Sequence, residues 1–310
     1  MSTDERTTGA ALRQVRVNLK GTISAMFSDI EINFRALAII SAFPAVLMLL
    51  LALLSKMITL IFLSFYVIAN KDVAWLARIN FLPNIIIQVI GFYVCSLWFT
   101  VVVAYITKRG QPYFIPSLTD MKNAIFVFLY GVLFFIITSL IMFGFVQFVF
   151  FYAGVAVGTL GTVTIPWRQS GPLLVFMPLI LILLAWFSSV THVNMPRIAM
   201  GYRPNLFTEV IRYSKGVQTG LTLRLVGLFI AVIAMMMVFA FFLGPAIMAA
   251  TVVHAGMPNP NNLSDVINYQ MTLIKASMLV DPFFLVFTAF FLWMFSLFLI
   301  EASWRIERRT

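Results

Sequence analysis

The sequence is poor in charge and in cysteine. Only 10% of its 310 residues are charged, whereas a soluble domain carries about 25%. Such a chain cannot cover itself with a polar surface, which excludes soluble domains as its main content. The single cysteine, Cys95, lies in an apolar run, so the chain has neither a disulfide framework nor a thiol cluster for a metal. We expect Cys95 to pack among apolar side chains.

Histidine and the usual catalytic motifs are scarce as well. His192 and His254 fall at opposite ends of predicted helices, too far apart to share a metal, so both are interpreted as interfacial polar residues. The stretch GTLGT at 158–162 has spaced glycines but lacks the lysine and the following helix of a phosphate loop. Neither a Gly-x-Ser-x-Gly nor a His-Glu-x-x-His pattern occurs. We expect no enzyme activity, no cofactor and no metal.

Apolar residues dominate instead. They make up 62% of the chain, with 32 Phe and a mean hydropathy of +1.00. Apolar runs long enough for a hydrocarbon core of about 30 Å predict an all-α, polytopic integral membrane protein with six transmembrane helices. These helices form one transmembrane domain, 36–304, between a cytoplasmic N-terminal segment, 1–35, and a cytoplasmic tail, 305–310. The predicted spans are approximately 36–66, 82–106, 125–155, 173–190, 225–253 and 282–301.

The first span has two interpretations. A helix that begins at Ala36 either ends near Lys56, leaving 57–69 in the outer interface, or continues as one long tilted helix. We favour the long helix, in which Lys56 snorkels to the interface or faces protein. An outer loop follows from Asn70 to about Asn80.

Local signals set the ends of the other helices. Pro83 is expected in the first turn of the second span, and Ser117 with Asp120 forms a capping-box pattern before the third. An outer loop is expected over 158–171. An amphipathic piece covers 263–278, and Asp281, as N-cap before Pro282, begins the sixth span. Gly244-Pro245 predicts a kink in the fifth.

The distribution of lysine and arginine predicts the orientation. Cations on one side number five before the first span, three around 108–122, five in a basic island at 192–224, and three at the C-terminus, which is 16 of the 21. Four lie on the other side, and Lys56 belongs to neither count. Because cytoplasmic loops carry the excess of cations, we expect both termini in the cytoplasm.

Two cytoplasmic segments have the pattern of interfacial amphipathic helices. In the first, apolar residues keep helical spacing from Leu12 to Phe34, and the second lies within the island at 206–217. The net charge of +10 therefore indicates a bilayer with anionic headgroups, not nucleic acid, as the partner of these cations. The residues predicted to contact headgroups are Arg13, Arg16, Lys20, Arg212 and Lys215.

Three polar residues are candidates for a role at membrane depth. Gln147 lies deep in the third span, where an interhelical hydrogen bond is favoured over a transport role. Arg224 and Glu301 both lie at inner helix ends, so we hypothesise that they pair.

These observations favour a non-enzymatic scaffold or assembly component of a larger complex, with a protein partner or a second copy of the chain. The alternative is a transporter or exporter of an apolar or amphipathic small molecule or lipid, for which Pro44, Pro178 and Pro245 inside spans are an argument. An intramembrane enzyme ranks third. Because about 35 residues precede a first apolar run that is too long for a signal core, we expect no cleaved leader. Short loops favour a bacterial inner membrane.

Overall fold

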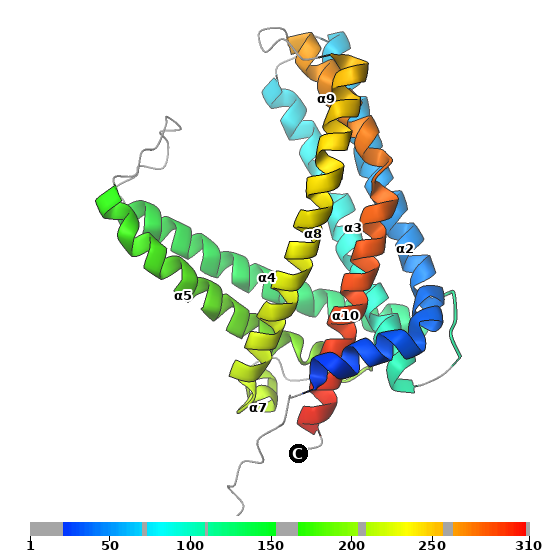
Figure 1. The fold of residues 1–310 in the computed structure, drawn as a ribbon, viewed down its shortest axis with the longest axis vertical. Helices are drawn as coiled ribbons and strands as arrows, with labels where there is room; N and C mark the ends of the chain where they lie inside the picture. Colours follow the sequence, from blue (N-terminus) through cyan, green and yellow to red (C-terminus); the bar gives the residue numbers. More distant parts are fainter. Residues whose placement is uncertain are drawn as a thin grey trace, which may run out of the picture. The chain divides into compact units, whose positions relative to one another are not determined.

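The computed structural model describes residues 21–69, 73–108, 111–152, 167–203, 209–256 and 263–307, and this part of the chain contains helices and no strand (Figure 1). The all-α prediction is confirmed. The long helices are α2 (Thr22–Ala69), α3 (Val73–Lys108), α4 (Leu118–Tyr152), α5 (Trp167–His192), α8 (Gln218–Ala255) and α10 (Asp281–Glu307). The shorter ones are α6 (Met195–Ala199), α7 (Glu209–Ser214) and α9 (Leu263–Met278).

Five helices in the described part are long and apolar enough to cross a bilayer. The shortest of these stretches has 21 residues, which at about 1.5 Å per residue covers a 30 Å hydrocarbon core. The sixth predicted span, 173–190, lies within α5, which is not among the five, so six spans stay a prediction. The five candidate stretches are Thr22–Phe65, Pro83–Lys108, Leu118–Phe145, Gln218–Val238 and Asp281–Glu307.

The helices gather into two compact units, which are described separately. The first, here called the loop unit, contains Phe126–Gly227 and Leu299–Thr310, together with the N-terminal residues to Thr22. The second, the bundle unit, contains Ile23–Ile125 and Leu228–Phe298. Helices α4, α8 and α10 contribute to both. The prediction of a single transmembrane domain over 36–304 is not tested by this division.

Polar contacts set the register of α2 and α3 in the bundle unit. Ser55 Oγ donates to Asn84 Oδ1 at 2.9 Å, and Tyr105 OH donates to Asn33 Oδ1 at 3.5 Å. As the numbers rise along α2 they fall along α3, so the two helices are antiparallel. This register places Ser41 level with Trp98, because each lies seven or eight residues, about 10–12 Å, from the Asn33–Tyr105 contact.

Helix α10 runs antiparallel to α2 in the same unit. Lys56 pairs with Asp281, and fifteen residues earlier on α2 the Ser41 hydroxyl accepts a 2.7 Å hydrogen bond from Trp293 Nε1. The Trp293 and Phe34 rings also pack in a T-shaped pair, with 5.7 Å between their centroids. Buried apolar residues of α3 and α10, among them Val101 and Leu297, fill the core.

The first helix continues through every point at which we expected a boundary. It has 48 residues and includes Lys56, so the long-helix interpretation is confirmed. Residues 22–35 belong to the same helix as the first span, and the interfacial amphipathic helix expected from Leu12 to Phe34 stays a prediction. Figure 1 shows the first part of α2 (dark blue) turned away from the rest of the helix. Pro44 lies inside α2 and removes one backbone hydrogen bond, which favours such a bend.

Two predicted outer loops are partly helical. Helix α3 begins at Val73, so Pro83 is not in the first turn, and α5 begins at Trp167, inside the stretch 158–171. Each start has an arginine and a proline nearby, Arg78 and Pro83 in α3 and Arg168 and Pro172 in α5, and neither residue type ends the helix there. Proline is tolerated inside membrane helices because neighbouring groups bond the freed carbonyl.

Two other boundary predictions are confirmed. The amphipathic piece 263–278 is the helix α9. At the start of α4, Asp120 Oδ2 accepts from the Ser117 amide at 3.0 Å and from its hydroxyl at 2.6 Å. Ser117 Oγ accepts in return from the Asp120 amide at 3.1 Å. This reciprocal cap satisfies donors that a helix start leaves without partners.

The ion pair between Lys56 and Asp281 was not predicted. Lys56 Nζ lies 2.5 Å from Asp281 Oδ1, with side chains 25% and 12% exposed. The sequence pattern predicts Asp281 only as an N-cap, but Asp281 is the first residue of α10, so the cap position is Val280. The second carboxylate oxygen of Asp281, Oδ2, is buried with no partner in the described part of the chain. The pair therefore carries most of the compensation for two charged groups within long apolar helices.

We expect Lys56→Met or Asp281→Asn alone to lower the free energy of unfolding by about 1–3 kcal/mol, because each leaves one group of a partly buried pair uncompensated. The double variant should be more stable than the sum of the two losses predicts. Denaturation of the purified protein in detergent measures this. Lys275→Met, which removes an exposed lysine of α9, is the control. Strictly additive losses would show that the two side chains are not coupled.

Candidate functional site

The basic island folds as a series of tight turns between α5 and α8. Helix α5 ends at His192, and α6 follows with Pro196 in its first turn, where the missing N–H of proline has no cost. Gly201, with φ of 97°, and Gly216, with φ of 83°, reverse the chain after α6 and after α7. Both need the left-handed conformation that glycine adopts easily. These turns bring α6 and α7 close enough to share side-chain contacts.

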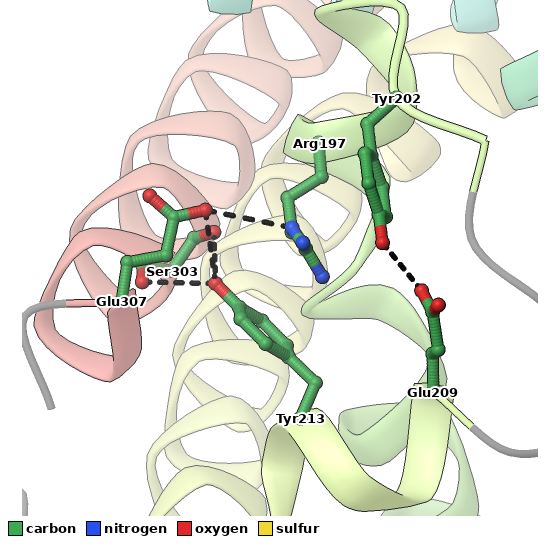
Figure 2. A network of polar contacts seen from close by, with 6 residues as sticks. All are labelled: Arg197, Tyr202, Glu209, Tyr213, Ser303 and Glu307. Carbon is green, nitrogen blue, oxygen red and sulfur yellow. Dashed lines mark hydrogen bonds and ion pairs between the residues drawn. The ribbon is translucent and has the colours of Figure 1, made fainter. Parts of the chain in front are cut away.

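Arg197 of α6 lies between two tyrosine rings. Its guanidinium carbon is 4.0 Å from the centroid of the Tyr202 ring and 4.4 Å from that of Tyr213, both within the range of a cation–π contact. On a third side, Arg197 Nε lies 3.5 Å from Glu307 Oε1, near the end of α10. One cation therefore joins α6, the turn after it, α7 and α10 (Figure 2).

The tyrosine hydroxyls extend this cluster, which we call the arginine–tyrosine network. Tyr213 OH lies 2.8 Å from Ser303 Oγ, 3.0 Å from the Ser303 carbonyl oxygen and 3.4 Å from Glu307 Oε1. Tyr202 OH donates to Glu209 Oε2 at 2.5 Å. Figure 2 shows the two hydroxyls bonded to different carboxylates, with Arg197 between the rings. The network thus ties the island to the last two turns of α10.

Burial raises the pKa of Tyr213 to about 12. The hydrogen bond to Ser303 and the charge of Arg197 act in the opposite direction, and the charge of Glu307 adds to the rise. The pKa of Tyr202 is also raised, chiefly because its hydroxyl donates to Glu209. Both phenols are therefore neutral donors at physiological pH and stabilise the carboxylates beside them.

Other cations of the island are also engaged within the loop unit. Arg203 lies over the Phe126 ring, 3.6 Å from its centroid, and donates to the Ile198 carbonyl oxygen at 3.2 Å. The side chains of Arg212 and Lys215, two of the predicted headgroup contacts, are exposed. Arg212 lies in the last turn of α7 and Lys215 directly follows the helix, a spacing of three residues that places side chains on one face of a helical turn. The arrangement can attract an anion.

The other predicted site residues are dispersed. Arg13, Arg16 and Lys20 lie outside the described residues, and Gln147 is half-buried near the end of α4. The hypothesis that Arg224 pairs with Glu301 is wrong. Arg224 donates to the carbonyl oxygen of Gly220 at 2.9 Å, and Glu301 accepts from Arg305 at 3.4 Å. Each has a nearer partner four residues away on its own helix.

The sequence analysis missed the residues that hold the network together. Tyr202, Tyr213 and Glu307 were not candidates, although both tyrosines lie within the basic island. Two aromatic residues among arginines are a signal for cation–π contacts that could have been noticed. The role of Glu307 had no such signal, because it is 110 residues from Arg197 in the chain.

Alkaline pH should weaken the network. The pKa of Tyr213 is higher in the folded protein than its ordinary value of 10.0, so its contribution to stability is complete below that pH and is lost as the pH rises through about 12. We expect the thermal stability of the purified protein to fall over this range, and to fall less steeply in Tyr213→Phe. Equal slopes in the two proteins would show that this hydroxyl is not linked to folding.

Comparison with protein-family models, with curated proteins and with solved structures found no match for this chain. Five apolar helices of bilayer length in one chain make this an all-helical, multi-pass membrane protein.

Proposed function

We propose that the protein is a non-enzymatic membrane scaffold whose basic island binds an acidic surface of a partner protein. The observation that carries the proposal is the arginine–tyrosine network. It uses Arg197 to order the island against α10 and leaves Arg212 and Lys215 exposed on one turn. A surface that is already ordered loses little conformational entropy on binding, so its contacts contribute more to affinity.

We also propose how the protein is oriented and in which membrane it resides. Lysine and arginine are divided 16 to 4 between the two sides of the predicted topology, and this excess supports a cytoplasmic location for the termini and the island. A cytoplasmic island is accessible to soluble partners and to anionic headgroups alike. We place the protein in a bacterial inner membrane.

Charge reversal at the exposed pair should release the partner. We expect wild-type protein, extracted gently from its own membrane, to capture a protein in stoichiometric amount, and Arg212→Glu/Lys215→Glu to capture roughly tenfold less because two attractive contacts become repulsive. Quantitative mass spectrometry of the captured material measures this. Lys275→Glu reverses an exposed charge on α9 and should behave as wild type. Undiminished capture by the double variant would contradict the proposal.

Transport of an apolar or amphipathic molecule is the second candidate. The observation in its favour is the partly buried ion pair of Lys56 and Asp281, close to the hydrogen bond between Ser55 and Asn84, because ionisable groups inside bilayer-length helices often line a pathway. The same extraction separates the two candidates. A wild-type protein that carries a specific small molecule or lipid and no protein partner would favour transport over the scaffold.

A further inference from the structure

A cavity of about 400 Å³ lies where α3 is joined to α4 in the bundle unit, within the size range of ligand sites. Its lining includes Lys108, the last residue of α3, and Ser117 and Asp120 at the start of α4. Two successive apolar stretches of bilayer length end and begin here, Pro83–Lys108 and Leu118–Phe145. A connection between successive spans lies at one face of the bilayer, so the cavity is at the depth of lipid headgroups.

Contacts within the bundle unit hold this connection in place. The Phe114 ring packs in a T-shaped pair with Phe43 of α2, with 6.2 Å between the ring centroids, and Pro116 is buried. Directly after Pro116, the reciprocal cap of Ser117 and Asp120 begins α4. The walls of the cavity are therefore fixed before a ligand binds, which lowers the entropy that binding costs.

Lys108 supplies a cation to the cavity, and the carboxylate in the same lining is already bonded. The Lys108 side chain is exposed and makes no ion pair or hydrogen bond within the part of the chain that the structure describes. Asp120 is only 4% exposed, and its Oδ2 accepts from the amide and hydroxyl of Ser117. Burial, the charge of Asp120 and a hydrogen bond to it raise the pKa of Tyr113, so this phenol is a neutral donor to the same carboxylate. Lys108 thus remains to meet an anion.

Large apolar side chains are exposed beside this cation. Phe114, Ile115 and Leu118 are 52%, 66% and 84% exposed, and Ile115 also lines the cavity. At a bilayer face, apolar side chains of this size enter the boundary between headgroups and acyl chains. A soluble phosphate would make no use of them. A phospholipid satisfies both features, because it offers a phosphate to the cation and acyl chains to the apolar residues.

We propose that this cavity binds the phosphate of an anionic phospholipid, with Lys108 Nζ donating to a phosphate oxygen and Phe114, Ile115 and Leu118 in contact with acyl chains of the same leaflet. The stretch 104–122 carries three cations and one carboxylate, which favours a headgroup with net negative charge over a zwitterionic one. The site is independent of the proposed scaffold function, because none of its residues belongs to the basic island. Lys108→Gln should therefore leave partner capture unchanged.

Photolabelling of one tryptic peptide tests the site. Full-length protein is reconstituted in phosphatidylcholine vesicles with a trace of phosphatidylglycerol or of phosphatidylcholine, each carrying the same diazirine in one acyl chain. Trypsin cuts after Arg109 and Lys122, so the peptide 110–122 reports on the connection. We expect the phosphatidylglycerol probe to label this peptide about fivefold more than the phosphatidylcholine probe, the factor expected for one lysine beside an anionic headgroup.

Two charge-neutralising variants separate the cavity from general attraction by charge. Lys108→Gln should bring the ratio of the two labels on this peptide close to one, and trypsin still releases the same peptide. Arg35→Gln removes an exposed cation of α2 that does not line the cavity, and it should keep the ratio of wild type. Equal losses in the two variants would overturn the proposal, and so would a ratio close to one in the wild-type protein.

A competition distinguishes a lipid phosphate from a free one. Unlabelled phosphatidylglycerol in the vesicle should lower labelling of 110–122 by the phosphatidylglycerol probe several-fold. Inorganic phosphate, added at constant ionic strength, should leave this labelling unchanged, because it makes no contact with the exposed apolar side chains. A several-fold loss with inorganic phosphate would show that the cavity takes a soluble phosphate and would contradict the assignment to a lipid.

Discussion

A polar side chain on a helix that crosses hydrocarbon has no water to bond, so it must bond to its own helix or to a neighbour. In the bundle unit this requirement selects the pairings of the helices. Ser55 with Asn84, Lys56 with Asp281, and Trp293 with Ser41 each join two helices at one height. Apolar faces alone would pack in several registers, because leucine and phenylalanine contacts are similar after a shift of one turn. The polar contacts make one register lower in free energy than the others.

The same requirement explains why unsatisfied groups are informative. Trp98 Nε1 and Asp281 Oδ2 are buried without partners in the described part of the chain, although their helices are held in place by other contacts. A group of this kind raises the free energy of the folded state unless something outside the chain bonds it. The ion pair to Lys56 already compensates Asp281, so its second oxygen carries less weight.

The loop unit solves a different problem, which is to order a segment rich in cations. Repulsion among arginines favours an extended island, and the structure removes Arg197 from that repulsion by placing it between two rings and a carboxylate. The rings supply attraction without negative charge, and Glu307 supplies the charge. The island is therefore ordered by groups from α6, α7 and α10 together. Arg212 and Lys215, which take no part in the network, have exposed side chains.

Composition and periodicity were sufficient to predict the fold class, the existence of most helices and several of their ends. An apolar run of bilayer length has few alternatives to a helix, since every backbone group must bond within the segment. The capping box at Ser117 and the helix at 263–278 were also predicted correctly, because their signals come from residues close together in the chain. The starts of α3 and α5 were wrong because proline and isolated charges do not end a helix in this setting.

Pairings between distant residues were decided only by the tertiary structure. The sequence suggested Arg224 with Glu301 from their similar depth, yet depth does not specify the direction in which a side chain points, and both bond to their own helices. The local sequence pattern does not reveal the partner of Lys56, the role of Glu307 or the unbonded N–H of Trp98. By itself the sequence determined that the chain enters a membrane as helices, because that depends on the apolar content of each segment. The tertiary structure decided which polar groups meet and which are left over, because that depends on the register and rotation of helices far apart in the chain.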